Sequence, residues 1–404
     1  MHFASSRELR IMLALACGAL WSSCGGSSRS LMSPSSSSSS SGGNVQAISV
    51  NGGPNGNYAN GVFTNVTVCA PGSSTCQTIN NVLVDTGSFG LRVLGSALTV
   101  SLPQQNDASG SPVVECAQFV LSTTWGPVKT ADVKLAGEAA NSIPIQVIGD
   151  PAFSMVPASC SSHGKPQQTL VALGANGILG IGFFIQDCGS ACAVSGAGNP
   201  GVYYACPSSA CQIIAQPGAK QVQNPVAAFS TDNNGTLLQL PSVSGSTASA
   251  NGSLIFGIGT QSNNGLGTAT VFKPNGSGNL TTTFHSASYP GFLDSGSNAY
   301  FFLTSNASGI PPCSSPEHGF YCPSSPDSLS ALNHGSNGTS NTVNFTIDSA
   351  TTLFANGGDS VFPNLAGPSA GNFDWGLPFF FGRNVFTAIE TRNTPAGTGP
   401  FWAY

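Results

Sequence analysis

The sequence predicts an all-β protein with two lobes, and three observations lead to that prediction. The chain has 404 residues, which is too long for one ordinary domain. Its 50 Gly and 27 Pro, with frequent Ser, Thr and Asn, are typical of turns between short strands. Only 7% of the residues are charged, so few Lys, Glu and Arg are available for the ion pairs that cover exposed helices.

The charge of the chain excludes one class of partner. The formal net charge is −5, and the 11 Lys and Arg residues are scattered along the sequence. A surface that follows a phosphate backbone needs a patch of basic residues. We therefore expect no nucleic-acid binding.

The first 24 residues have the features of an export signal. Two arginines precede an apolar run from Ile11 to Trp21, which is too short to span a bilayer. Small residues before Cys24, and Gly and Ser after it, resemble the cleavage box of a bacterial lipoprotein. Cys24 is therefore the expected lipidation site. Cys17 is a weaker competitor, and a plain signal is the alternative.

Residues 25–43 form a Ser/Gly tether that contains seven consecutive serines. A segment of this composition buries no apolar surface and stays flexible. The expected location is outside the cytoplasm, anchored to a bacterial membrane or cell surface through the lipid alone. Without the lipid, the protein would be periplasmic or secreted.

The remaining ten cysteines predict five disulfides, because an even number in an oxidising compartment pairs fully. Close neighbours such as Cys69 with Cys76 and Cys313 with Cys322 would close hairpin loops, and Cys116 with Cys160 would be a longer link, although the connectivity does not follow from the sequence alone. The other four cysteines lie in a Cys-rich stretch over residues 186–224. They form either two disulfides or, at looser spacing than usual, a zinc site: Cys188, Cys192, Cys206 and Cys211.

The body of the chain reads as a series of short strands. These are alternating or short apolar runs bounded by turn residues: 62–68, 81–84, 254–256 and 343–347. The only predicted helices are short, around 225–230 and 328–333.

One sequence motif occurs twice. Each copy is an apolar run that ends in Asp, followed by a hydroxyl residue, Gly and Ser: 82–88 around Asp85 and 291–297 around Asp294. A buried charge costs several kcal/mol unless it is hydrogen-bonded. The Gly allows a sharp turn that presents a backbone N–H, and the Ser offers a hydroxyl. Two copies, one for each predicted lobe, indicate a shared function.

With these motifs the chain resembles the pepsin-like aspartic peptidases, which are two-lobed β proteins with one catalytic Asp in each lobe. Residues 176–182 (Asn-Gly-Ile-Leu-Gly-Ile-Gly) are similar to the segment that threads the first Asp loop in that family. Residues 379–390 resemble the corresponding segment of the second lobe, and 252–257 resemble a strand that opens it. The resemblance implies an N-terminal lobe over 44–224, a C-terminal lobe over 225–404 and a cleft between them.

The resemblance also implies a mechanism. Asp85 and Asp294 would form a dyad that shares one proton and activates a water molecule to hydrolyse a peptide bond. Around them, Thr86 and Ser295 would brace the two loops, and Ser88 and Ser297 would bond the outer carboxylate oxygens. Gly87 and Gly296 would supply the turns. The implied substrate is a polypeptide, with no metal or other cofactor, and the implied oligomeric state is a monomer.

A flap is expected between the first Asp and residue 178. Residues 121–133 resemble that hairpin, with Trp125 and Gly126 in the place where the family has Tyr-Gly at the tip. An indole N–H donates a hydrogen bond but cannot accept one, so the flap network would differ.

Two other functions remain open. An inactive pepsin-like lipoprotein would bind peptide or glycan in its cleft and would not depend on either Asp. A glycosidase also uses two carboxylates, although nothing in its chemistry requires the repeated Asp-[Ser/Thr]-Gly-Ser phrase.

Overall fold

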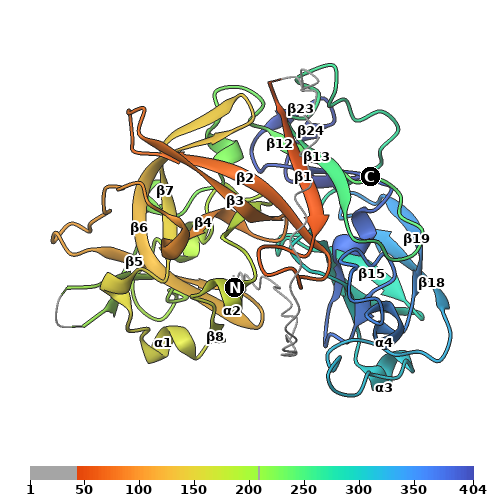
Figure 1. Ribbon diagram of the computed structural model, residues 1–404. Coiled ribbons are helices and arrows are strands. Elements are labelled where there is room, and N and C mark those ends of the chain that lie inside the picture. The colour runs from red at the N-terminus through yellow and green to blue at the C-terminus, as the bar shows by residue number, and fades with distance from the viewer. Residues whose placement is uncertain (1–42, 208–209) are drawn as a thin grey trace, which may run out of the picture.

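A computed structural model describes residues 43–207 and 210–404 (Figure 1). The predicted leader, its lipidation site Cys24 and all of the tether except Gly43 lie outside the described residues. Within the described part of the chain, no helix is both long and apolar enough to cross a membrane.

The molecule is built from strands arranged in two lobes, which confirms the predicted fold class. The strands of the first half are β1 Val45–Asn51, β2 Gly61–Cys69, β3 Cys76–Asp85, β4 Phe89–Leu94, β5 Val113–Gln118, β6 Ser122–Leu135, β7 Glu138–Ile148, β8 Lys165–Pro166, β9 Gly177–Ile181, β10 Tyr203–Ala205 and β11 Gln212–Ile213. The strands of the second half are β12 Gly235–Gln239, β13 Ala250–Phe256, β14 Val271–Phe272, β15 Leu280–Phe284, β16 Ala287–Leu293, β17 Tyr300–Phe302, β18 Asp327–His334, β19 Ser340–Ile347, β20 Ala366–Gly367, β21 Phe373–Trp375, β22 Asn384–Ala388, β23 Asn393–Thr394, β24 Gly397–Thr398 and β25 Phe401–Ala403.

Helices in the described residues are single turns at the ends of loops. The α-helices are α1 Ala158–Ser161, α2 Leu170–Leu173, α3 Ser305–Ser308 and α4 Ala350–Leu353. The 3₁₀ turns are η1 Gly95–Ala97, η2 Pro151–Phe153, η3 Gly189–Ala191, η4 Gly218–Lys220, η5 Pro225–Ala228 and η6 Leu377–Phe380.

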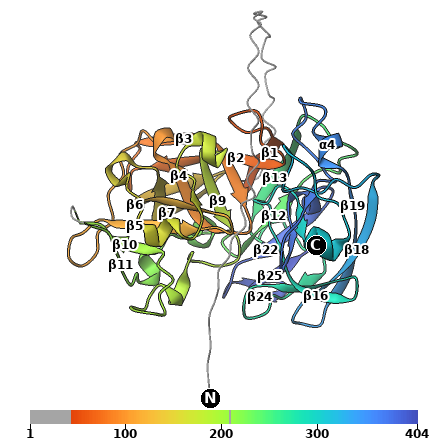
Figure 2. The ribbon, with the colours of Figure 1, turned by 90° about the horizontal axis from the view of Figure 1, so that it is seen from below.

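A continuous sheet joins the two lobes. In the 16-stranded sheet, β1 pairs antiparallel with β13, and β12, β22, β25 and β14 follow on the C-terminal side. A second, 7-stranded sheet has the order β19-β18-β15-β16-β21-β17-β20 and lies within the C-terminal half. Figure 2 shows β1, β12, β13 and β22 between the two lobes. The predicted lobe boundary at residues 224 and 225 stays a prediction.

The predicted strands coincide with β2, β3, β13 and β19, but one predicted helix was wrong. Residues 328–333 lie in β18, which pairs with β19 on one side and β15 on the other. The buried side chains of its second half, Ala331 and Asn333, alternate with half-buried ones, as a strand requires and a helix does not. The segment around 225–230 forms the 3₁₀ turn η5.

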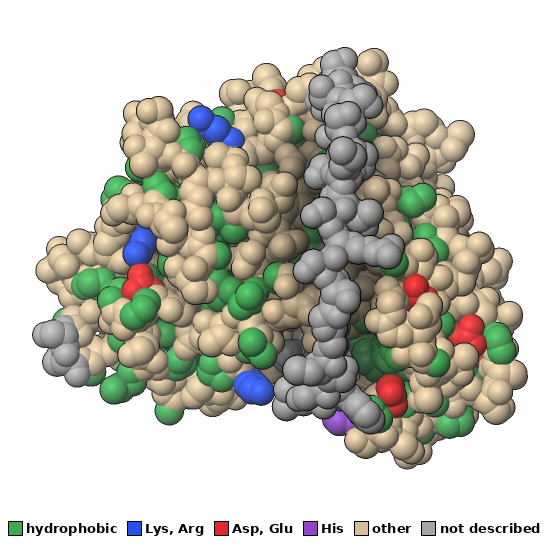
Figure 3. All heavy atoms as spheres, viewed as in Figure 1, with side chains coloured by type: hydrophobic (Ala, Val, Ile, Leu, Met, Phe, Trp, Pro, Cys, Tyr) green, Lys and Arg blue, Asp and Glu red, His purple; other side chains and the backbone are tan. Residues whose placement is uncertain are grey.

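All five predicted disulfides are present. Cys69 pairs with Cys76, Cys313 with Cys322 and Cys116 with Cys160, and the Cys-rich stretch closes as Cys188–Cys192 and Cys206–Cys211. These four sulfurs are bonded in two pairs, so they are not available as zinc ligands. Charged side chains are scattered over the face of the molecule seen in Figure 3 and form no basic patch there.

Candidate active site

The two Asp loops are built in the same way at the ends of two strands. β3 ends at Asp85 and runs parallel to β9, with Asp85 opposite Gly180. In the second half β16 ends just before Asp294 and runs parallel to β21. The Asp294 N–H donates to the Trp375 carbonyl at 3.0 Å. Each of the two Asp residues therefore lies at the carboxyl end of a strand, beside a parallel neighbouring strand.

The threading segment of the second loop differs from the expected one. Residues 373–376 (Phe-Asp-Trp-Gly) lie beside β16, whereas Phe379 and Phe380 follow in η6 and Phe381 forms a bridge with Leu240. The segment around residue 178 is placed as expected, on β9 beside β3. The correction has a packing reason: Gly376 lies against the Ala299 and Ser297 carbonyls, where a Cβ would collide.

Thr86 and Ser295 connect the two loops by reciprocal hydrogen bonds. The Thr86 N–H donates to Ser295 Oγ at 3.0 Å, and the Ser295 N–H donates to Thr86 Oγ1 at 2.9 Å. Each hydroxyl then donates to a carbonyl of the opposite loop: Thr86 to Leu293 at 3.2 Å and Ser295 to Val84 at 2.8 Å. Four bonds between segments so distant in sequence fix the position of one Asp relative to the other.

The glycines bring the two carboxyl groups together. Gly87 N–H donates to Asp85 Oδ1, and Gly296 N–H donates to Asp294 Oδ1, both at 2.8 Å. A Cβ on Gly87 would lie 2.5 Å from Asp294 Cγ, and one on Gly296 would lie 2.6 Å from Asp85 Oδ1. Each turn therefore lies directly against the carboxyl group of the other loop, and only Gly leaves room for it.

The serines after the glycines complete the first layer around the carboxyl groups. Ser297 Oγ donates to Asp294 Oδ2 at 2.9 Å. Ser88 is fully buried and close enough to Asp85 to lower the pKa of that carboxyl, but its Oγ makes no hydrogen bond at standard distance and angle within the described part of the chain, so the bond expected for it is not formed. The sequence-predicted residues of the two loops are thus gathered at one centre.

Burial dominates the electrostatics of the pair. Both carboxyl groups are 0% exposed. Burial raises the pKa of Asp85, while Ser88, Asp294, the Gly87 N–H and Arg92 act in the opposite direction. Burial raises the pKa of Asp294 further, and the charges of Asp85 and Asp374 add to that increase. Asp85 is therefore the member that ionises first, and Asp294 keeps its proton to higher pH.

Tyr58 belongs to this centre although no sequence motif marks it. It lies in the loop between β1 and β2, and burial and the charges of Asp85 and Asp294 raise its pKa. The same loop inserts into the other lobe, where Asn60 Nδ2 donates to the Asn298 and Phe362 carbonyls at 2.7 and 2.9 Å. A motif search would not find Tyr58, because it lies in a loop outside both Asp motifs and packs beside Phe63, near the first of them, only in the folded chain.

Trp125 is not at a flap tip, so that prediction was wrong. It lies inside β6, is 0% exposed and packs edge-to-face against Tyr204, while its Nε1 donates to the Phe153 carbonyl at 2.8 Å. Gly126, beside it, packs against the Val147 carbonyl. The indole faces the core because it pairs with the disulfide-bonded Cys116 across the ladder.

The turn of the β5–β6 hairpin lies at residues 119–121 instead. Leu121 at this turn is 61% exposed. Phe119 is buried in a cluster with Leu83 and Ile178, against which Tyr58 packs. The hairpin therefore reaches the strands that carry Asp85 through Phe119.

Replacement of Trp125 tests this correction. Trp125→Phe should lower the free energy of unfolding by about 1–3 kcal/mol, because the half-buried Phe153 carbonyl loses its donor. Turnover should stay at the wild-type level, since the indole does not contact the dyad. Urea unfolding and a peptidase assay on the same preparation check both. A large loss of kcat in a stable variant would favour a flap role.

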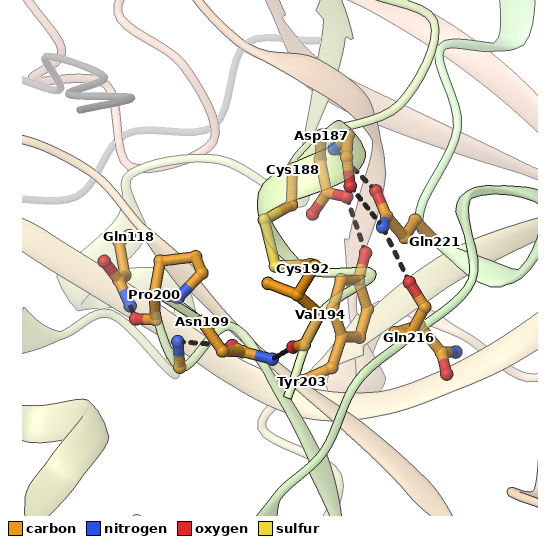
Figure 4. Close-up of a disulfide and its surroundings, with 12 residues drawn as sticks. Gln118, Asp187, Cys188, Cys192, Val194, Asn199, Pro200, Tyr203, Gln216 and Gln221 are labelled. Carbon is orange, nitrogen blue, oxygen red and sulfur yellow. Dashed lines mark hydrogen bonds between the residues drawn. A yellow bond between two sulfur atoms is a disulfide. The ribbon is translucent and has the colours of Figure 1, made fainter. Parts of the chain in front are cut away.

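The Cys-rich stretch, for which the resemblance offers no counterpart, closes around a buried ionic cluster. Arg92 Nη2 donates to Glu115 Oε1 at 2.5 Å and to Asp187 Oδ2 at 3.1 Å, and all three side chains are at most 4% exposed. The Tyr203 hydroxyl donates to Asp187 Oδ1 at 2.6 Å. Figure 4 shows Tyr203 pointing at Asp187 beside the Cys188–Cys192 disulfide.

This cluster connects the Cys-rich stretch to the dyad. β10 adds Tyr203 to the edge of β5, so the stretch extends the sheet that carries Glu115. Arg92 lies on β4, the strand that follows the first Asp loop, and its charge lowers the pKa of Asp85. A cation, Arg92, therefore acts on Asp85, whereas a further carboxyl group, Asp374, acts on Asp294.

Comparisons with known proteins agree with this architecture. A model of the family described as "Protein of unknown function (DUF3443)" matches residues 40–404. No curated protein matches the chain. The crystal structure of an aspartic proteinase from Irpex lacteus is similar, with a TM-score of 0.52 and 15% identity over 89% of this chain and 96% of that one. At this identity the likeness establishes the bilobal fold and leaves activity to be argued from the site.

Proposed function

The chain belongs to the DUF3443 family, and we propose that it is an aspartic endopeptidase that hydrolyses peptide bonds with a water molecule activated between Asp85 and Asp294. One observation carries the proposal. The Gly of each Asp loop lies against the carboxyl group of the other loop, so two buried carboxyl groups meet at one centre. Two acids in such a position cannot both ionise cheaply and share a proton.

The asymmetry of the site supports a different role for each Asp. Asp85, with Arg92 behind it, is the ionised member and takes a proton from water as the oxygen attacks the scissile carbonyl carbon. Asp294, whose pKa is raised further, gives its proton to the carbonyl oxygen. The resulting tetrahedral diol collapses when Asp85 gives its proton to the amide nitrogen, the C–N bond breaks, and a diol hydroxyl returns a proton to Asp294 as the carbonyl forms again. The dyad ends with one proton, as it began.

The setting of this activity is proposed to be outside the cytoplasm. Five disulfides support an oxidising compartment. The sequence before the tether supports export and a lipid at Cys24. We propose a monomer that needs no cofactor and acts on polypeptides near a bacterial membrane or cell surface.

A cleavage assay tests the proposal. The full, disulfide-intact chain is incubated with a reduced and alkylated protein at pH 3 to 7, and new peptides are identified by mass spectrometry. Asp294→Asn, prepared in the same way, is the matched control against a contaminating protease. Cleavage by the wild type alone is expected. Absence of cleavage by a folded wild type at every pH would contradict the proposal and favour a peptide- or glycan-binding protein.

The pH profile of turnover is a separate expectation. Asp85 must be ionised and Asp294 protonated, so kcat should follow a bell-shaped curve. Burial raises the pKa of both carboxyl groups, and that of Asp294 more, so both limbs lie above the range of ordinary carboxyl groups. We expect an optimum on the acidic side of neutral, measured with a fixed peptide at saturating concentration. Maximal turnover at pH 9 would be incompatible with a shared proton.

A further inference from the structure

A third buried carboxyl group lies at the dyad and has no role in the proposed mechanism. Asp374 stands in the middle of β21 and is 0% exposed. Among the described residues, neither of its oxygens has a partner at hydrogen-bond distance and angle, and no ion pair includes it. A carboxylic acid buried in this way costs several kcal/mol, so its presence calls for a reason.

The two halves of the molecule show how unusual the position is. In the first half, β3 pairs with β9 so that Ile178 lies opposite Leu83, two residues before Asp85. In the second half, β16 pairs with β21 so that Asp374 lies opposite Phe292, two residues before Asp294. Asp374 therefore occupies the place that a buried Ile occupies in the other lobe.

Asp374 is coupled to both catalytic carboxyl groups. The charge of Asp374 adds to the rise in the pKa of Asp294. Burial raises the pKa of Asp374 itself, and the charge of Asp85 raises it further. The Ser297 hydroxyl, which donates to Asp294 Oδ2, is close enough to lower the pKa of Asp374. Three acids thus act on one another across a single buried centre.

The other titratable groups around these three carboxyl groups do not neutralise their negative charge. The strands flanking β21 contribute only tyrosines as titratable residues, Tyr289 from β16 and Tyr300 from β17. Tyr58 approaches from the other lobe, and Arg92 acts on Asp85 from the far side. Asp85, whose pKa is raised least, is therefore the first of the three to ionise.

We propose that Asp374 is a positioning residue that holds the shared proton on Asp294 and extends the working range of the dyad toward neutral pH. The inference rests on the proposed peptidase function. When Asp374 ionises, its negative charge opposes the loss of the proton from Asp294, so the acid needed for the carbonyl oxygen survives to higher pH. The substrate does not contact Asp374 in this mechanism.

Two substitutions separate charge from packing. Asp374→Asn keeps the shape and removes the charge, and Asp374→Ile restores the residue type of the other lobe. In both, the alkaline limb of the kcat profile should move down by about one pH unit or more, while kcat at the acidic optimum stays near the wild-type value. Asp327→Asn, at the start of β18, is the control and should leave the profile unchanged. An unmoved alkaline limb in both variants would overturn the inference.

A second measurement does not need activity. Because the pKa of Asp374 is raised on folding, its contribution to stability is present at low pH and is lost as pH rises above the ordinary range of a carboxyl group. Urea unfolding from pH 4 to 8 should therefore show a weaker loss of stability with pH in Asp374→Asn than in the wild type. In an Asp294→Asn background, the same substitution should change that dependence less.

The two assays separate failure of the inference from failure of the proposed function. If the wild type cleaves nothing, the peptidase proposal fails, and the unfolding data still decide whether Asp374 and Asp294 are coupled. Equal effects of Asp374→Asn in the two backgrounds would show independent acids and would overturn the inference.

Discussion

Asn in place of either Asp85 or Asp294 should lower kcat by about 10²–10⁴-fold, the range that positioned acid–base groups contribute. The amide has the shape of the carboxyl group but cannot accept or release the proton that the mechanism moves. Both variants should fold, because the hydrogen bonds between Thr86 and Ser295 do not involve either carboxyl group. Steady-state kinetics with one peptide, beside urea unfolding, gives both results.

Binding distinguishes this result from the alternative function. A cleft that only binds peptide or glycan should keep its affinity in both Asn variants, and the wild type would show no turnover to lose. The surface change Asp327→Asn is a control for the loss of one charge. Retention of wild-type kcat in either dyad variant would remove the dyad from the mechanism.

The second large effect is expected at Arg92. Arg92→Met should destabilise the fold by about 3–5 kcal/mol, because Glu115 and Asp187 would remain buried without their cation. Burial and the charge of Glu115 raise the pKa of Asp187 and the Arg92 charge opposes them, so loss of the cation would raise it further. The destabilisation should therefore be largest at neutral pH and shrink as pH falls and Asp187 becomes protonated. Urea unfolding at several pH values measures it.

A second substitution serves as the internal control for Arg92. Glu115→Gln in the Arg92→Met background removes one of the two buried charges that lack a cation, and it should recover part of the lost stability. Equal stability of Arg92→Met and the wild type would mean that the cluster contributes nothing to the fold. Because Arg92 also lowers the pKa of Asp85, the acid limb of the kcat profile should move to higher pH in Arg92→Met.

The features that could be predicted from the sequence are those formed by residues close together in the chain. The apolar run, Asp, hydroxyl residue, Gly and Ser stand next to one another, so both Asp loops can be recognised from the sequence alone. Disulfides between near neighbours such as Cys69 and Cys76 can be predicted for the same reason. Strand identity followed from alternation in β19, where polar and apolar residues alternate along the chain and the apolar ones share one buried face.

The errors and omissions concern contacts between distant segments. Trp125-Gly126 resembles a flap tip locally, but its position in β6 is set by Cys116 across the ladder. Asp374 is a lone Asp between two aromatic residues, and only the pairing of β21 with β16 brings it to the dyad. Arg92, similarly, gains its partners only when the Cys-rich stretch folds back onto β5.

The central claim is that Asp85 and Asp294 share one proton, and a direct titration tests it. The chain has only 16 Asp and Glu residues, so the ¹³C resonances of labelled Asp carboxyl groups should be resolvable by NMR. Asp85→Asn and Asp294→Asn assign the two signals of interest. We expect two separate steps for the pair, with the later one well above the range of ordinary carboxyl groups, and a fall in that later step when either partner is replaced. Two carboxyl groups that titrate independently near the ordinary value of 3.8, unaffected by loss of the partner, would contradict the claim.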